Sequence, residues 1–239
     1  MNSSPYRYRQ GLKEGIPVGL AYFSVSFGFG ITAIASGFSA IQAILISMTN
    51  LTSAGQVAGA AIFAAAGTLL ELVLTQIVIN ARYALMGITL TQKLSPECTT
   101  KHRLLMSFGI TDEIFALAVS KPEPVGPAYF YGLMTTPYIG WALGTAFGAF
   151  AGQLLPESIR ASLGILIYAM FLSIMIPVAK KSLGVLLTIL FAIGFSCAFH
   201  FIPPLSVVPE GYVIILSSLL SAALVSLIRP IKEEPDHEA

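Results

Sequence analysis

The sequence predicts an all-α, polytopic integral membrane protein. Of its 239 residues, 55% are hydrophobic and only 10% are charged, and the mean hydropathy is +0.79. Soluble domains carry about 25% charged residues, so the composition excludes an ordinary soluble protein. The apolar runs are long and apolar on all sides, whereas a membrane β-barrel shows alternating strands of about 10 residues. Helices are therefore the predicted element.

Hydrophobic segments follow one another along the chain and are separated by polar or proline-containing stretches. A spanning helix needs about 20 mostly apolar residues, and most of the segments approach that length. In order, the segments are 16–37, 40–66, 68–90, 104–119, 128–152, 162–179, 183–200 and 212–228. The prediction is about 7–8 hydrophobic segments, of which one or two are broken or re-entrant.

The first segment, 16–37, is too long for the core of a cleavable signal peptide, which has about 7–15 apolar residues. We expect it to be retained as a membrane span. The domain prediction places a cytoplasmic N-terminus at 1–15, a single transmembrane helical domain at 16–229 and a solvated acidic tail at 230–239.

A faint internal similarity connects the two halves of this domain. Pro17 is followed ten residues later by Phe27, and Pro137 is followed at the same spacing by Phe147. Transporters often arise by duplication and keep weak internal similarity, so the chain is interpreted as two weak repeats, about 16–103 and 126–229. Chance matching of glycine-rich helices is the alternative.

The second segment, 40–66, contains the polar and glycine-containing stretch 47–56, which makes a poor lipid-facing helix. Irregular backbone at membrane depth is tolerated only where protein buries it or water reaches it. The stretch predicts a broken or re-entrant helix. The alternative is a polar loop outside the membrane between two short interfacial helices.

Positive charge favours the same interpretation. Arg7, Arg9 and Lys13 predict a cytoplasmic N-terminus by the positive-inside rule. The basic loops near 93–103, 180–181 and 229–232 fall on that same side only if 40–66 and 104–119 each fail to cross the membrane fully.

Two polar clusters inside apolar segments are the first candidates for a working site. Asn80 and Arg82 lie within 68–90, and Asp112 and Glu113 lie within 104–119. An ionisable group at the bilayer centre costs about 2.5–3.5 kcal/mol on insertion scales, and such groups are usually paired and functional. Glu71 shares a helix face with Arg82, but eleven residues separate the two by about 16 Å. Arg82 therefore needs Asp112 or Glu113 as its partner.

The remaining carboxylate is then available for a ligand ammonium or for a proton. A broken helix presents a positive N-terminus that holds a carboxylate, so the two features together suit a zwitterion such as an amino acid. The predicted substrate-binding residues are Ser53, Gly55, Gln56, Asn80, Arg82, Asp112 and Glu113, with Asp112 and Glu113 also coupling protons. Phe23, Phe27, Ile114 and Phe115 are the expected apolar lining. The alternative is a purely structural ion pair.

Other chemistry finds little support in the sequence. The chain lacks the HExxH, GxSxG and Walker A motifs, and its three histidines are scattered. Cys98 and Cys197 are far apart and fit neither a metal motif nor a disulfide framework. A net charge of +1 gives no sign of nucleic-acid binding. No enzyme activity, cofactor or metal is predicted.

The chain resembles the AzlC family of branched-chain amino acid transport proteins over nearly its whole length. The matching stretches are GIPVGLAYF at 15–23, NARYALMG at 80–87 and FGITDEIFA at 108–116, together with the polar break that ends in Gln56. The chain departs from the family pattern at LTSAGQV, 51–57, and at Tyr83, where histidine is common. These departures affect the substrate and any proton step more than the fold.

The resemblance implies a larger subunit that works with a small hydrophobic AzlD-like membrane subunit in the inner membrane. It further implies export of branched-chain or similar apolar amino acids, driven by an ion gradient. Two other functions stay open from the residues alone: a non-transporting membrane scaffold or regulatory subunit, and a channel for small neutral solutes.

Overall fold

The structure is a computed structural model that describes residues 4–156, 158–159 and 165–230. Within these residues the chain folds into α-helices, and Leu94 and Val125 pair in an isolated β-bridge. The helices are α1 (Tyr8–Ala35), α2 (Ala40–Thr49), α3 (Ala54–Ala64), α4 (Leu69–Lys93), α5 (Thr100–Phe108), α6 (Asp112–Val119), α7 (Pro127–Leu154), α9 (Leu166–Lys181), α10 (Leu183–Phe201) and α11 (Glu210–Ile228). The predicted all-α polytopic fold is confirmed.

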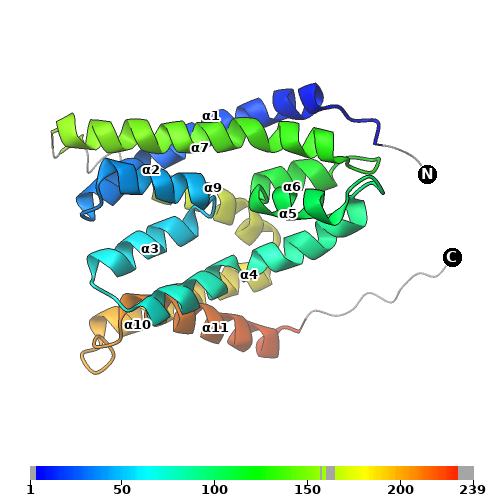
Figure 1. Cartoon of the computed structure of the whole chain (residues 1–239). Coiled ribbons are helices and arrows are strands. Elements are labelled where there is room, and N and C mark those ends of the chain that lie inside the picture. Colours follow the sequence, from blue (N-terminus) through cyan, green and yellow to red (C-terminus); the bar gives the residue numbers. More distant parts are fainter. Residues whose placement is uncertain (1–3, 157, 160–164, 231–239) are drawn as a thin grey trace.

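The long helices α1 and α7 lie side by side and run in the same direction (Figure 1). Their backbones touch because glycines line the contact. A Cβ atom added to Gly140 would lie 2.2 Å from the Gly19 carbonyl oxygen, and one added to Gly148 would lie 2.0 Å from that of Phe27. Small residues of this kind allow close helix packing in lipid, where van der Waals contact replaces the hydrophobic effect.

The register of this pair agrees with the spacing of the two predicted repeats. Gly19 lies against Gly140, and Phe27 against Gly148, which is close to the offset between Pro17 and Pro137. The two helices that carry the similar motifs are therefore neighbours in space. The repeat boundaries themselves stay a prediction.

Two helical hairpins enter the molecule from opposite ends and turn back near its middle (Figure 1). The α2–α3 hairpin begins next to the end of α1 and returns to it, since Phe38 and Phe63 stack with ring centroids 4.3 Å apart. The α5–α6 hairpin begins and ends at the other end of the molecule, where the Lys121 ammonium binds the Glu14 carboxylate at 2.7 Å. The helix break predicted within 40–66 is present between α2 and α3, and the chain also turns within 104–119, between α5 and α6. How the two hairpins lie in the membrane stays a prediction.

Helices α4, α10 and α11 form a layer beside this core (Figure 1). Four helices among the described residues are long and apolar enough to cross a membrane: Tyr8–Ala35, Leu69–Lys93, Leu183–Phe201 and Glu210–Ile228. The window of α10 has no buried residues and that of α4 is 11% buried. These two helices therefore present most of their apolar surface outward.

The first helix starts earlier than predicted, at Tyr8 rather than near residue 16. Its first two turns carry Arg9 and Lys13, both exposed, so an apolar segment search does not include them. Pro17 lies inside the helix, which membrane helices tolerate. The acidic residues of the predicted tail lie in 231–239, outside the described residues.

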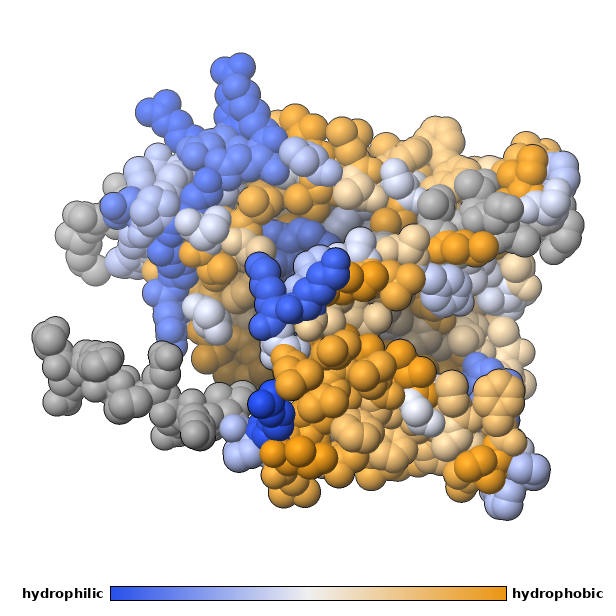
Figure 2. All heavy atoms as spheres, turned by 180° about the vertical axis from the view of Figure 1, so that it is seen from behind, coloured by the Kyte–Doolittle hydropathy of each residue, from blue (hydrophilic) through white to orange (hydrophobic). Residues whose placement is uncertain are grey.

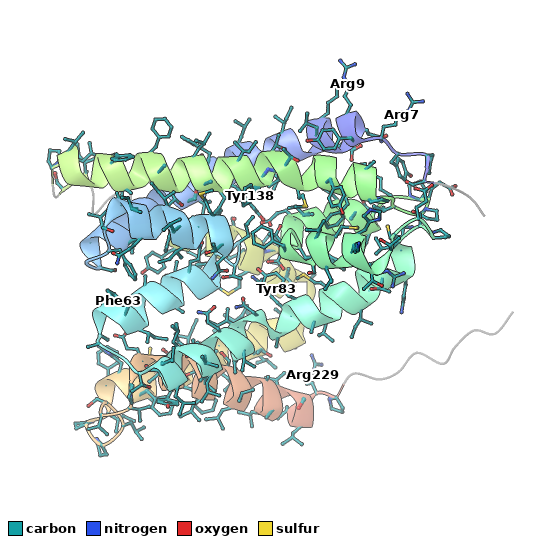
Figure 3. The ribbon with its side chains drawn as sticks, in the orientation of Figure 1. Arg7, Arg9, Phe63, Tyr83, Tyr138 and Arg229 are labelled. Atoms are coloured by element: carbon teal, nitrogen blue, oxygen red, sulfur yellow. The ribbon has the colours of Figure 1, made fainter. Side chains whose placement is uncertain are left out.

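Basic side chains gather at one end of the molecule. Figure 2 shows the hydrophilic surface over the end that holds the N-terminal part of α1, and Figure 3 shows Arg7 and Arg9 projecting there. The C-terminal end of α4, with Lys93, and the end of α11, with Arg229, point the same way (Figure 1). Since α10 and α11 form an antiparallel hairpin, Lys181, the last residue of α9 just before α10, belongs to this side as well.

The close contact of α1 and α7 predicts that adding one methyl group at a contact glycine lowers the stability of the protein. We expect Gly148→Ala to destabilise the detergent-solubilised protein by about 1–3 kcal/mol, since the new Cβ meets backbone that cannot move aside. Thermal unfolding would show a midpoint lower by roughly 2–10 °C. Gly194→Ala in α10 is the control, because nothing lies within 4 Å of its added Cβ. Equal midpoints for the two variants would contradict the contact.

The arrangement of the hairpins predicts which loops share a side of the membrane. We expect Glu97→Cys and Lys181→Cys to react with an impermeant maleimide from the same side, and Ser206→Cys from the other. The background would lack Cys197 but keep Cys98, because Cys98 is buried and burial raises the pKa of its thiol, so it reacts slowly. Labelling of positions 97 and 181 from opposite sides would rule out the re-entrant hairpins.

Candidate functional site

A cavity of about 340 Å³ lies where the tips of the two hairpins meet. The α2–α3 tip contributes Leu51 and Ser53, and the α5–α6 tip contributes Thr111, Asp112 and Glu113. The remaining lining residues come from α1, α4, α7 and α9: Tyr22, Arg82, Tyr83, Trp141, Phe171 and Met175. Four of the seven predicted substrate-binding residues therefore share one cavity: Ser53, Arg82, Asp112 and Glu113.

Arg82 pairs with Asp112 across the cavity wall. Arg82 Nη1 lies 2.5 Å from Asp112 Oδ2, and the two side chains are 39% and 32% exposed. The guanidinium also donates to the Tyr83 hydroxyl at 3.3 Å and lies 5.0 Å from the centre of that ring. Its Nε is buried without a hydrogen-bond partner among the described residues. The partner of Arg82 is thus Asp112, a choice that the sequence left open.

Glu113 is bound differently from its neighbour. Its Oε2 accepts a hydrogen bond from the Tyr22 hydroxyl of α1, and no ion pair holds it among the described residues. Both carboxylates lie in the first turn of α6, which Thr111 caps through its hydroxyl. A helix N-terminus stabilises negative charge, so the short helix supports two carboxylates that Arg82 alone does not neutralise.

The tip of the α2–α3 hairpin is strained. Ser53 has φ 51° and ψ −84°, a conformation that non-glycine residues rarely adopt. Its hydroxyl is buried with no hydrogen-bond partner among the described residues. Such strain costs about 1–3 kcal/mol and gathers at functional sites. The first turn of α3 contains no acidic residue, so its positive end faces the cavity region uncompensated.

The other three predicted residues lie behind the cavity wall. The Gln56 amide accepts from the Trp141 indole at 2.9 Å and donates to Ser47 at 3.2 Å. The Gly55 carbonyl accepts from Gln76 at 2.8 Å. Asn80 donates to the Gln76 side chain at 3.0 Å. These residues support the α3 tip from behind rather than lining the cavity.

The expected apolar lining was wrong. Ile114 is fully buried in the core, and Phe23 faces away from the cavity against Phe147, with ring centroids 5.8 Å apart. Successive residues of a helix point about 100° apart, because the helix has 3.6 residues per turn. The face of α1 that meets the cavity therefore carries Tyr22 and not Phe23.

Sequence reasoning missed the aromatic wall formed by Tyr22, Tyr83 and Trp141. Tyr22 and Trp141 meet edge to face, with centroids 5.3 Å apart. One signal for Tyr22 and Trp141 was available in the sequence, because each is a large amphipathic side chain within a glycine-rich helix. Their convergence depends on the rotation of α1 against α7, which no single segment encodes.

Glu71, the other carboxylate in an apolar segment, serves a separate purpose. Its Oε1 accepts from the Gly211 backbone N–H at 2.7 Å, and Thr75 donates to the Gly211 carbonyl at 3.2 Å. Glu71 thus caps the start of α11 from α4 and lies outside the cavity. Among the described residues, no three His, Cys, Asp or Glu side chains come together as metal ligands.

A helical membrane protein in which two opposed helical hairpins meet at a charged cavity has the architecture of a membrane transport protein. Irregular backbone and ionisable side chains at membrane depth occur together around such substrate or ion pathways.

Comparison with known proteins agrees with this class. The family model described as AzlC protein matches residues 17–155, and the chain belongs to the AzlC family. The inner membrane protein YgaZ of Escherichia coli is 28% identical over 76% of this chain and 77% of its own length. An uncharacterized membrane protein of Archaeoglobus fulgidus is 31% identical over 72% and 76%.

A third relative carries a functional name. The branched-chain amino acid transport protein AzlC of Bacillus subtilis is 25% identical over 61% of this chain and 58% of its own length. No solved structure is significantly similar to the chain. Family membership supports a role in membrane transport rather than in catalysis.

The ion pair predicts coupling between Arg82 and Asp112. We expect the Arg82→Gln, Asp112→Asn double variant to lose less stability than the sum of the losses in the two single variants. The difference, the coupling free energy, is expected to be on the order of 1 kcal/mol. Thermal unfolding of the four proteins in detergent measures it. Asp112→Asn combined with Arg103→Gln is the control, because Arg103 binds the Cys98 carbonyl instead. Additive effects for Arg82 and Asp112 would exclude a direct interaction.

Proposed function

We propose that this chain is the larger subunit of an exporter for branched-chain or similar apolar amino acids. The observation that carries the proposal is the cavity at the hairpin tips, which combines Arg82, Asp112 and Glu113 with an aromatic and apolar wall. Its volume of about 340 Å³ is near the lower end of small-molecule sites, which span about 300–1,000 Å³. A single small amino acid suits that size.

The charges of the cavity suit the two ends of a zwitterion. Arg82 already neutralises Asp112, so Glu113 is the carboxylate available to a substrate ammonium. Tyr22 and Tyr83 place aromatic rings around the same position, and aromatic faces also attract cations. The substrate carboxylate would lie toward Ser53 and the N-terminus of α3, which provide positive potential and an unsatisfied hydroxyl.

The apolar side chain of the substrate would then pack on Leu51, Phe171, Met175 and the Trp141 ring, which line the cavity. These residues come from different elements, so a substrate bound there would contact the α2–α3 tip and α9 together. Such contacts are a means of coupling binding to movement of the hairpins. Among the predicted residues that lie behind the wall, Asn80 and Gly55 would support the α3 tip.

Ion coupling would use the same carboxylates. In this proposal Asp112 or Glu113 takes up a proton when the substrate ammonium leaves, so an outward movement of substrate is linked to the proton gradient. The N-terminus would be cytoplasmic in the inner membrane, as the gathered basic side chains favour.

A small hydrophobic AzlD-like subunit would complete the exporter. That partner is taken from the family resemblance. The surfaces available to it include the outward faces of α4 and α10, where most of the apolar spanning residues are unburied.

The proposal predicts loss of efflux on neutralising one carboxylate. In cells loaded with labelled valine, isoleucine or methionine, with and without the small partner, we expect Asp112→Asn or Glu113→Gln to lower efflux at least about tenfold, which corresponds to about 1.4 kcal/mol of transition-state stabilisation. Glu71→Gln is the matched control, because Glu71 is also a carboxylate in an apolar segment but binds the Gly211 N–H outside the cavity.

Three outcomes separate the candidate functions. Efflux that survives both cavity variants unchanged, with normal assembly, would contradict the transport role and leave a scaffold or regulatory subunit. Efflux that is insensitive to collapse of the proton gradient would favour a channel. No export of any of the three amino acids by the native protein would remove the substrate assignment.

A further inference from the structure

Trp141 occupies a special place in the cavity wall. It is the one tryptophan of the chain, it lies near the middle of α7, and only 2% of it is exposed. Its ring lines the cavity and packs edge to face against Tyr22, whose hydroxyl binds Glu113. The ring therefore stands between the scaffold helix α7 and the carboxylate proposed to bind the substrate ammonium.

A buried chain of hydrogen bonds fixes the orientation of this ring. The Trp141 indole donates to Gln56 at 2.9 Å, Gln56 donates to Ser47 at 3.2 Å, and the Ser47 and Thr145 hydroxyls lie 2.7 Å apart. Gln56 is 3% exposed, and Ser47 and Thr145 are fully buried. Buried polar groups are costly unless hydrogen-bonded, and a fully satisfied network specifies one arrangement.

The network also joins three elements. Trp141 and Thr145 belong to α7, Ser47 to α2 and Gln56 to α3, so the network holds the α2–α3 hairpin against the glycine-paired scaffold. If the ring turned into the cavity, the indole N–H would lose its hydrogen bond to Gln56, which lies behind the wall. Gln56 thus fixes how far the ring extends toward a bound molecule.

We propose that Trp141 sets the upper size limit of the substrate side chain, and that Gln56 is a positioning residue that acts through Trp141 without touching the substrate. This inference rests on the proposed amino-acid transport. It deepens that proposal by assigning selectivity to one ring that reaches the cavity from α7.

Substrate selectivity tests the inference. We expect Trp141→Phe, which shortens the wall and removes the N–H donor, to raise the efflux of phenylalanine relative to valine by about tenfold, the scale on which a pocket discriminates small apolar groups. Gln56→Leu, which keeps the ring but releases it, is expected to broaden selectivity in the same direction. Phe23→Leu is the matched control, because Phe23 lies next to Tyr22 but faces Phe147 outside the cavity.

A second measurement starts from the native protein. Because Trp141 is the single tryptophan, the fluorescence of the native protein under selective tryptophan excitation comes from this ring alone. We expect a saturable change in its emission, and protection from acrylamide, when valine, isoleucine or methionine is added. Glycine, which cannot reach the ring, is expected to give a much smaller change. In Gln56→Leu we expect stronger acrylamide quenching without ligand.

The failures of the two proposals are distinguishable. Absence of amino-acid export by the native protein contradicts the proposed function. Two results would contradict the assignment to Trp141 while export continues. One is a Trp141 emission that no substrate changes. The other is a ratio of phenylalanine to valine efflux that stays native in Trp141→Phe and Gln56→Leu. A purely structural role predicts lower stability for these variants with unchanged selectivity.

Discussion

The close contact of α1 with α7 is the constraint on which the rest of the structure depends. The two backbones are in direct contact at Gly19 and Gly140 and at Phe27 and Gly148, with no side chain between them. Each helix therefore fixes the rotation of the other. That rotation turns Tyr22 and Trp141 toward the same space and leaves Phe23 on the outer side. In lipid, where apolar side chains gain little by leaving the solvent, such contact is what holds a scaffold together. The cavity wall is therefore a consequence of glycine placement rather than of the residues in the wall.

The scaffold helices α7 and α4 satisfy backbone groups at the tip of the α2–α3 hairpin. The Met48 carbonyl, at the end of α2, accepts from the Tyr138 hydroxyl of α7 at 3.1 Å, and the Gly55 carbonyl accepts from Gln76 of α4. Unsatisfied backbone groups in hydrocarbon cost several kcal/mol each. Two hydroxyls at this tip, those of Thr52 and Ser53, are buried without a hydrogen-bond partner among the described residues, and Ser53 also lines the cavity.

Much of the site could be predicted because charge in a membrane is expensive. That argument required a partner for Arg82, excluded Glu71 by distance and selected 112–113, and Asp112 is the observed partner. The same argument failed for residues whose contacts depend on how their helix is rotated in the folded protein. Gln56 was predicted from its type and position to touch substrate, yet its amide is engaged by Trp141 and Ser47. Tyr22 and Trp141 were missed because an aromatic residue in an apolar helix carries no local sign of the side that it faces.

The two adjacent carboxylates of α6 illustrate how one helix turn creates two different environments. Adjacent residues point about 100° apart, so Asp112 reaches α4 and Glu113 reaches α1. Asp112 is held by a guanidinium, an interaction that a weakly bound molecule does not easily displace. Glu113 is held by a neutral hydroxyl, which an ammonium ion can replace because a charged donor binds a carboxylate more strongly. The pairing of Arg82 with Asp112 therefore leaves Glu113 as the group whose partner can change, and any substrate-linked movement of the α5–α6 hairpin would begin at the Tyr22 contact.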